Sequence, residues 1–196
     1  EGNVIHQALS NAGIPSVRQS MQSVFRSEEA MELERVLVGI AFYSKEAYVR
    51  AALLTNFVGM RLSDLVRLDS GIESWDEVLS KFYSLHECWL NSGFMQMFQN
   101  FLSTFNVQQR LAKFTDSDRR LTNLMHLSEC IQAKSVNHSS ISETLNWIST
   151  ERIRSSGLED DSLERLESDE NRIQIVTIHA SKGLQYPIVF VPFAWD

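Results

Sequence analysis

The chain reads Thr177-Ile178-His179-Ala180-Ser181-Lys182-Gly183-Leu184-Gln185 near its C-terminal end. This polar stretch follows an apolar run at 173–178 that is typical of a buried strand, and Tyr186-Pro187 leads from it into a second strand-like run at 188–191. In α/β folds, loops at the ends of buried strands carry the polar and glycine residues that bind ligands. The stretch therefore predicts a functional loop at a sheet edge, with at most one helical turn before the second strand.

The side chains of this loop suit contact with a nucleotide or a nucleic acid. Thr177 and Ser181 offer hydroxyl groups, and Lys182 offers a positive charge. Gly183 allows the backbone to approach a phosphate or a sugar closely. His179 can donate a hydrogen bond to a DNA phosphate or stack against a base. On spacing alone, a capped turn between two buried strands is the alternative interpretation.

The middle of the chain, from about residue 46 to about residue 154, carries only helical signals. Apolar residues recur there at helical spacing, and capping-box patterns begin two of the runs, at Ser74 and Ser140. Stripes of Met and Phe in this region are typical of a core rather than of a cofactor site. We expect six to eight helices in this segment.

The N-terminal segment returns to mixed signals. Gly13 closes a helical run, and residues 14–17 are typical of a short strand. Ser27 begins the next helix, because its hydroxyl can cap the helix while Glu28 and Glu29 lie at the positive end of the helix dipole. Strand signals at both ends of a long helical region predict an α/β domain that is split by a large all-α insertion.

Charge and composition exclude several classes of protein. The net charge of −7 is concentrated in residues 156–170, so any nucleic-acid contact elsewhere must be local. No apolar stretch approaches the roughly 18 residues of a membrane span, and we expect no membrane association. Cys88 and Cys130 lie in helical patterns, as small core residues of a protein in a reducing compartment would. The sequence therefore favours a cytoplasmic protein.

Several common catalytic patterns are absent from the sequence. It contains no G-x-x-x-x-G-K-[ST] phosphate loop, so the chain cannot by itself hold a triphosphate in that manner. Asp169 and Glu170 precede their strand, whereas a magnesium-binding acidic pair follows one. No cluster of metal ligands stands out, and we predict no metal site.

The loop at 177–186 resembles motif V of superfamily 1 DNA helicases of the UvrD/RecB type, written T-x-H-x-S-K-G-L-x-[YF]. Residues 8–17 and 23–33 resemble the motif IV region of the same helicases. Together with residues 119–127 and 165–169, these segments are most similar in sequence to the RecB-type beta subunits of exodeoxyribonuclease V. That enzyme is the ATP-dependent helicase-nuclease of bacterial double-strand-break repair. The resemblance spans essentially the whole chain, and motif V is its most specific part.

The resemblance implies a fold for each segment. Residues 1–42 and 170–196 correspond to parts of a split RecA-like motor domain, called 2A, and residues 43–169 correspond to its helical insertion, called 2B, which ends in an acidic linker. The phosphate loop, the arginine-containing motif VI and the nuclease domain would lie elsewhere in a longer protein. We therefore expect the chain to be inactive on its own.

The resemblance also assigns roles to single residues. Three side chains would face single-stranded DNA: Thr177, His179 and Ser181. Four residues would lie near the ATP cleft: Lys182, Gly183, Gln185 and Glu29. Gln185 departs from the family, which usually has an acid at this position to bind the ribose. An amide keeps hydrogen bonding but loses its charge-assisted strength.

Charged residues outside the loop leave two interpretations open. Glu29 and Glu32 match the acids of the motif IV helix, and the alternative to a nucleotide contact is a solvated acid that stabilises the helix dipole. Arg119 and Arg120 either touch a DNA backbone or form surface salt bridges with neighbouring acids such as Asp116.

The function implied by the resemblance is the coupling of ATP hydrolysis, with Mg²⁺, to translocation along single-stranded DNA and to duplex unwinding in repair and recombination. Its implied partners are single-stranded and duplex DNA and the gamma and alpha subunits of exodeoxyribonuclease V, in the bacterial cytoplasm at the nucleoid. One alternative is another UvrD-like or AddA-type helicase. An alternative of a different class is a non-catalytic helical interaction module whose loop is only a structural turn.

Overall fold

The computed structural model describes residues 2–14, 16–18, 23–71, 74–135, 140–153, 173–176, 181 and 185–192. The chain divides into two compact units: a terminal unit, made of residues 1–20 and 166–196, and a helical unit, made of residues 21–165. The acidic stretch at 156–170, including Asp169 and Glu170, lies outside the described residues. Assignment of the units to subdomains 2A and 2B stays a prediction.

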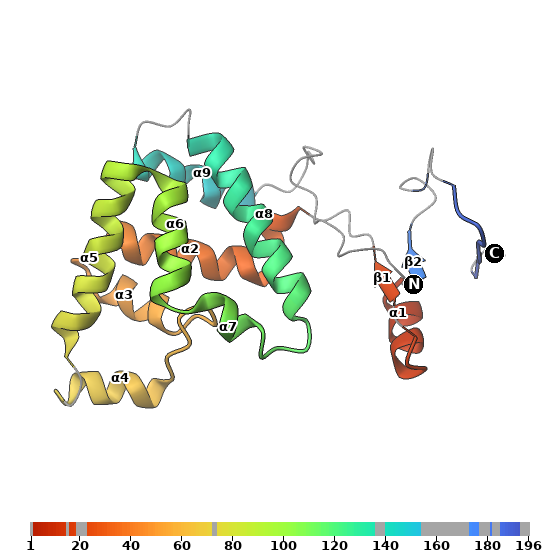
Figure 1. Ribbon diagram of the computed structural model, residues 1–196, viewed down its shortest axis with the longest axis horizontal. Helices are drawn as coiled ribbons and strands as arrows, with labels where there is room; N and C mark the ends of the chain where they lie inside the picture. Colours follow the sequence, from red (N-terminus) through yellow and green to blue (C-terminus); the bar gives the residue numbers. More distant parts are fainter. Residues whose placement is uncertain are drawn as a thin grey trace. The chain divides into compact units, whose positions relative to one another are not determined.

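The terminal unit contains α1 (Gly2–Asn11), β1 (Ser16–Arg18) and β2 (Ile173–Ile175). The two strands pair in parallel, and α1 contacts both of them (Figure 1). The register pairs Ser16 with Ile173 and Arg18 with Ile175. The segments from the two ends of the sequence therefore share one small sheet, as the mixed signals at both ends predicted.

Gly13 ends α1 as the sequence predicted. Its φ of 70° lies in the left-handed region, which glycine adopts without the steric cost that a side chain imposes. The turn places the Ile14 backbone N–H 2.9 Å from the Leu9 carbonyl oxygen, so one of the last carbonyls of the helix is satisfied. The chain can then enter β1 directly.

The prediction of a second strand at 188–191 was wrong. These described residues form no strand, and their side chains are 57% to 83% exposed. β2 is also less buried than predicted, with Ile173 41% exposed. A strand needs a neighbour for its backbone hydrogen bonds, and within the described residues β2 pairs only with the three-residue β1.

The helical unit begins with a short 3₁₀ turn, η1 (Val24–Arg26). Eight α-helices follow in the described part of the unit: α2 (Glu28–Ala41), α3 (Glu46–Leu53), α4 (Leu62–Asp69), α5 (Trp75–Ser92), α6 (Phe94–Thr104), α7 (Val107–Leu111), α8 (Ser117–Ser135) and α9 (Ile141–Ile153). The seven described helices from α3 onward confirm the expected six to eight.

Local signals set where these helices begin. The Ser27 hydroxyl accepts a hydrogen bond from the Ala30 N–H at 3.2 Å and caps α2, as predicted. Ser140 caps α9 in the same way through the Glu143 N–H, also at 3.2 Å. Ser74 does precede α5, but its side chain makes no capping hydrogen bond. The sequence therefore located this start correctly and overstated its cap.

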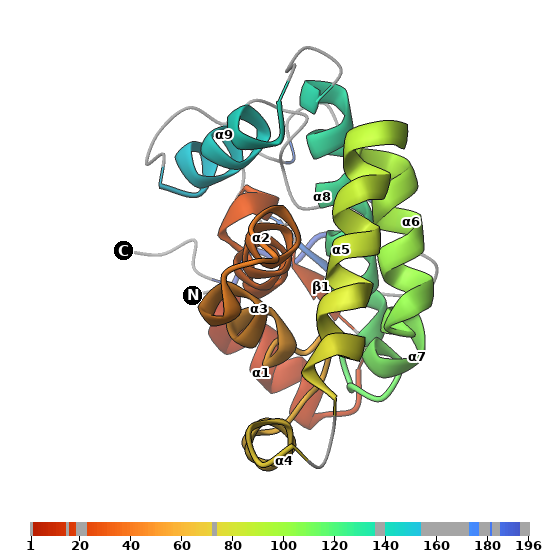
Figure 2. The ribbon, with the colours of Figure 1, turned by 90° about the vertical axis from the view of Figure 1, so that its left-hand side faces the viewer.

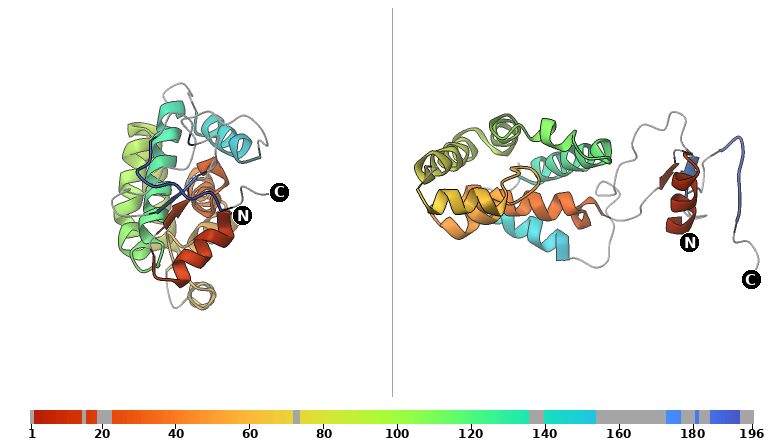
Figure 3. Two further views of the ribbon diagram at one scale, coloured as in Figure 1. Left: turned by 90° about the vertical axis from the view of Figure 1, so that its right-hand side faces the viewer. Right: turned by 90° about the horizontal axis from the view of Figure 1, so that it is seen from below.

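α2 is the central helix of the helical unit. Its apolar stripe is buried, and α3, α5, α8 and α9 all contact it (Figure 2). Seen from below, α2, α3 and α9 form one layer and α5, α6 and α8 form the other (Figure 3). The domain boundary predicted from the sequence, at residues 42–43, lies after α2. The boundary between the two compact units, at residues 20–21, lies before α2.

Gly39 allows α3 and α5 to pack closely against α2 near its C-terminal end. A Cβ atom at this position would lie 2.8 Å from the Cβ of Ala52 in α3 and 3.2 Å from Cε1 of Phe82 in α5. Both neighbours are completely buried. A glycine here therefore serves close packing, although it is not favoured within a helix.

In the part of the chain that the structure describes, no helix is long and apolar enough to cross a membrane.

Candidate functional site

The predicted DNA and nucleotide loop lies in the terminal unit and is described only in part. Ser181 is half-buried, and Gln185 is exposed to solvent. Four of its predicted site residues lie outside the described residues: Thr177, His179, Lys182 and Gly183. Their roles therefore stay predictions. The exposed amide of Gln185 is open to a ligand, as a contact with a nucleotide requires.

A hydrogen bond that the sequence analysis missed fixes the strand beside β2. Nδ1 of His6, on α1, lies 2.9 Å from Oγ of Ser16, the first residue of β1. The contact joins two residues ten positions apart, on a helix and on a strand. It therefore ties α1 to the sheet whose other strand leads into the predicted loop.

Glu29 lies at the other predicted nucleotide position, in the helical unit. Its side chain is only 1% exposed, so the alternative of a solvated surface acid was wrong. The Asn123 side-chain amide donates to Oε2 of Glu29 at 3.1 Å, and a guanidinium nitrogen of Arg120 lies 3.4 Å from Oε1. The carboxylate thus connects the first turn of α2 to α8. At this position it also complements the dipole of α2.

Arg120 gathers three acidic residues around one guanidinium group. Its Nε lies 2.8 Å from Oδ1 of Asp116, and Nη2 lies 3.5 Å from Oε2 of Glu28. The guanidinium also stands 4.7 Å from the centre of the Phe114 ring. Only 13% of the Arg120 side chain is exposed, and its ion pairs with Glu28 and Glu29 connect α8 to α2.

Asp116 forms salt bridges with both arginines, as one of the two interpretations predicted. Both arginines bind it, and Nη2 of Arg119 lies 2.8 Å from its Oδ2. Burial acts to raise the pKa of Asp116, but the hydrogen bonds from Arg119 and Arg120 outweigh it, so the pKa lies below its ordinary value. Asp116 therefore remains ionised and holds both cations.

Glu32, the second acid of the predicted motif IV helix, is also a structural link. The backbone N–H of Asn56 donates to its Oε2 at 3.0 Å, and the Asn56 side chain donates to its Oε1 at 2.6 Å. Burial raises the pKa of Glu32 above its ordinary value, although the two bonds from Asn56 and the charge of Arg120 partly offset this rise. Glu32 thus joins α2 to the turn after α3.

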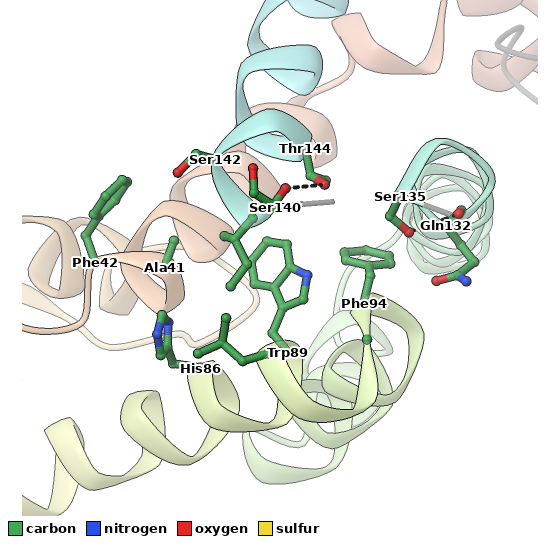
Figure 4. Close-up of a pocket in the computed structure, with 13 residues that line it drawn as sticks. Ala41, Phe42, His86, Trp89, Phe94, Gln132, Ser135, Ser140, Ser142 and Thr144 are labelled. Atoms are coloured by element: carbon green, nitrogen blue, oxygen red, sulfur yellow. Dashed lines mark hydrogen bonds between the residues drawn. The ribbon is translucent and has the colours of Figure 1, made fainter. Parts of the chain in front are cut away.

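A pocket of about 550 Å³ is lined by residues of α2, α5, α6, α8 and α9, and the sequence did not reveal it (Figure 4). Most of its polar side chains bond within the protein. Nδ1 of His86 lies 3.2 Å from the Ile40 carbonyl oxygen, and Oε1 of Gln132 accepts from the Met95 N–H at 3.2 Å. The Thr144 hydroxyl donates to the Ser140 carbonyl oxygen. This pocket therefore offers few polar groups to a ligand.

Comparison with known proteins identifies the family of this chain. Residues 21–195 match the family described as the UvrD-like helicase C-terminal domain. The chain is 34% identical over 194 residues to the RecBCD enzyme subunit RecB of Escherichia coli strain K12, and the match covers 98% of this chain and 16% of that protein.

Other relatives bear the same name. The RecB subunit of Haemophilus influenzae is 30% identical over 98% of this chain and 16% of its own length. That of Mycolicibacterium smegmatis is 28% identical over 100% of this chain and 18% of its own length. The chain therefore spans less than a fifth of each of these relatives. It belongs to the UvrD-like helicase C-terminal domain family, and within that family it is of the RecB type.

Proposed function

We propose that this chain is part of a RecB-like DNA helicase that couples ATP hydrolysis to translocation along single-stranded DNA and to duplex unwinding. In this proposal the terminal unit belongs to a split RecA-like motor domain, 2A, and the helical unit is its 2B insertion. Because the relatives are named as subunits of RecBCD enzymes, we also propose assembly with gamma and alpha subunits in a bacterial cytoplasmic complex.

The observation that carries the proposal is the parallel pairing of β1 with β2. The whole helical unit separates these strands in the sequence, yet they share one register. In parallel pairs the C-terminal ends of the strands meet at the same edge, where α/β proteins bind their ligands. At that edge the chain leaves β1 for the helical unit and leaves β2 for the motif V loop.

The loop would divide its contacts between two ligands. Thr177, His179 and Ser181 supply two hydroxyls and an imidazole, which suit the phosphates and bases of single-stranded DNA. Lys182 and Gly183 supply a charge and close backbone approach for a nucleotide. One short loop that touches both ligands can transmit the state of the nucleotide to the grip on DNA.

The remaining nucleotide contacts follow from what the described side chains can do. Gln185 is exposed and can both donate and accept hydrogen bonds, as a contact with the ribose requires. Glu29 is buried against Arg120 and Asn123, so we propose that it fixes α2 rather than binding ATP directly. We propose that Mg²⁺ accompanies ATP in the longer protein, where the phosphate loop supplies a hydroxyl to the ion.

ATP turnover tests this proposal. We expect the longer protein, expressed from the complete reading frame, to hydrolyse ATP faster when single-stranded DNA is added. The 196-residue chain has no phosphate loop, and we expect it to show only background turnover under the same conditions. Steady-state phosphate release measures both rates. Turnover by the short chain, or a longer protein that ignores DNA, would contradict the proposal.

A further inference from the structure

A group of aromatic side chains lies at the surface of the helical unit, around the turn between α2 and α3. We call it the aromatic surface, and it consists of Phe42, Tyr43, Tyr48, Tyr83 and His86. Phe42, Tyr48 and Tyr83 are 39%, 41% and 46% exposed, so much of each ring is open to solvent. Large aromatic side chains clustered at a surface commonly mark a binding site.

The rings hold one another in place. The centres of Tyr43 and Tyr83 are 5.3 Å apart in an edge-to-face arrangement, and those of Tyr43 and His86 are 5.0 Å apart. Phe42 and Tyr48 are 5.7 Å apart. Figure 4 shows Phe42 and His86 among the residues that line the pocket, and Phe42 directly precedes Tyr43 in the chain. Rings fixed in this way lose little conformational freedom when a planar ligand stacks on them.

A cation accompanies the rings. The ammonium group of Lys45 stands 5.6 Å from the centre of the Phe42 ring and 5.8 Å from that of Tyr48. Within the described residues no carboxylate forms an ion pair with Lys45, whereas Arg50 and Arg152 are each paired with an acid. An unpaired ammonium beside exposed rings favours an anionic ligand with planar groups.

We propose that the aromatic surface binds single-stranded nucleic acid, with bases stacked on its exposed rings and Lys45 at a phosphate. Exposed aromatic side chains beside a positive charge are the combination that binds single strands with little sequence preference. The inference rests on the proposed function for its choice of ligand. It adds a contact in the helical unit, away from the motif V loop in the sequence.

The test measures binding by the 196-residue chain without nucleotide. The probe is a fluorescein-labelled oligothymidylate of about 12 nucleotides, within the range of single-strand site sizes. Anisotropy at low salt gives its dissociation constant for the wild type and for the Tyr48→Ala and Tyr83→Ala variants. We expect each variant to bind on the order of tenfold more weakly, because one base loses the tyrosine ring on which it stacks.

Matched controls separate stacking from charge and from folding. Tyr48→Phe and Tyr83→Phe keep the rings and are expected to retain wild-type affinity. An abasic oligonucleotide of the same length keeps the phosphates and is expected to bind more weakly than oligothymidylate. Leu62→Ala removes an exposed apolar side chain of α4 and is expected to change nothing. Melting temperatures show that each variant is folded at the temperature of the binding measurement, because more than half of the Tyr48 and Tyr83 side chains is packed against the protein.

Three outcomes overturn the inference: no binding of oligothymidylate, equal binding of the abasic probe, or unchanged affinity in both alanine variants. The last is expected if the surface instead docks a protein. The motor proposal is tested by ATP turnover, whereas this inference is tested by DNA binding without nucleotide. A longer protein with DNA-stimulated turnover whose tyrosine variants bind DNA normally would overturn the inference alone.

Discussion

Replacing Arg120 with methionine is expected to destabilise the helical unit by about 3–5 kcal/mol, the usual cost of removing one partner of a buried ion pair. The reason is Glu29, which is 1% exposed and would lose the cation beside its carboxylate. Methionine keeps an apolar stem against Phe114, so the loss reports mainly on the charge. Urea denaturation followed by tryptophan fluorescence measures it, because Trp147 packs against Phe25 in this unit.

Arg119 provides the matched control for this prediction. It also binds Asp116, but its side chain is 48% exposed, and Arg119→Met should cost no more than about 1 kcal/mol. Adding Glu29→Gln to Arg120→Met should recover part of the loss, because the uncompensated charge is removed. Equal effects of the two arginine substitutions would mean that the joint between α2 and α8 does not depend on Glu29.

His179→Ala and Lys182→Ala, each made in the longer protein, are expected to reduce DNA-stimulated ATP turnover by about 100-fold or more. Each change removes a group that we place at a phosphate, and losing one such stabilising group commonly costs a factor of this size. The melting temperature should barely change. Steady-state turnover with saturating single-stranded DNA, together with thermal melting, distinguishes the two effects.

Lys113→Ala serves as the control for the loss of a lysine charge, since Lys113 is exposed in the helical unit. It should leave turnover unchanged. If the loop were only a structural turn, His179→Ala and Lys182→Ala would instead lower the melting temperature. Full turnover in both variants would contradict the roles assigned to the loop.

Local signals in the sequence predicted most of the helical fold. Ser27 caps α2 and Gly13 ends α1, and both act on backbone groups only a few residues away. Such short-range hydrogen bonds can be inferred from neighbouring residues alone. The same holds for Asp116, whose ion pairs with Arg119 and Arg120 span one helical turn.

Long-range packing decided the points that the sequence could not show. The buried Glu29 accepts a hydrogen bond from Asn123, 94 positions away, and no local pattern indicates that pair. The aromatic surface likewise joins Tyr43, in the turn after α2, to Tyr83 in α5. The apolar run at 188–191 satisfies strand propensity, but a strand also needs a partner, which propensity does not reveal.

Motif V was identified by the similarity of its sequence to a helicase motif. The spacing of its residues alone did not distinguish a ligand-binding loop from a structural turn. The family match at 21–195 supports that interpretation for the chain as a whole. Within the loop, the structure describes Ser181 and Gln185 and shows the latter exposed. The division of DNA and nucleotide contacts among its residues is part of the proposed function.

The most direct test of the central claim is the affinity of the longer protein for single-stranded DNA with and without a non-hydrolysable ATP analogue. If motif V couples the two ligands, the analogue changes the dissociation constant of DNA in the wild type, and DNA changes that of the analogue by the same factor. In Lys182→Ala both shifts should disappear. A Lys182→Ala variant that keeps the wild-type shift would contradict the claim.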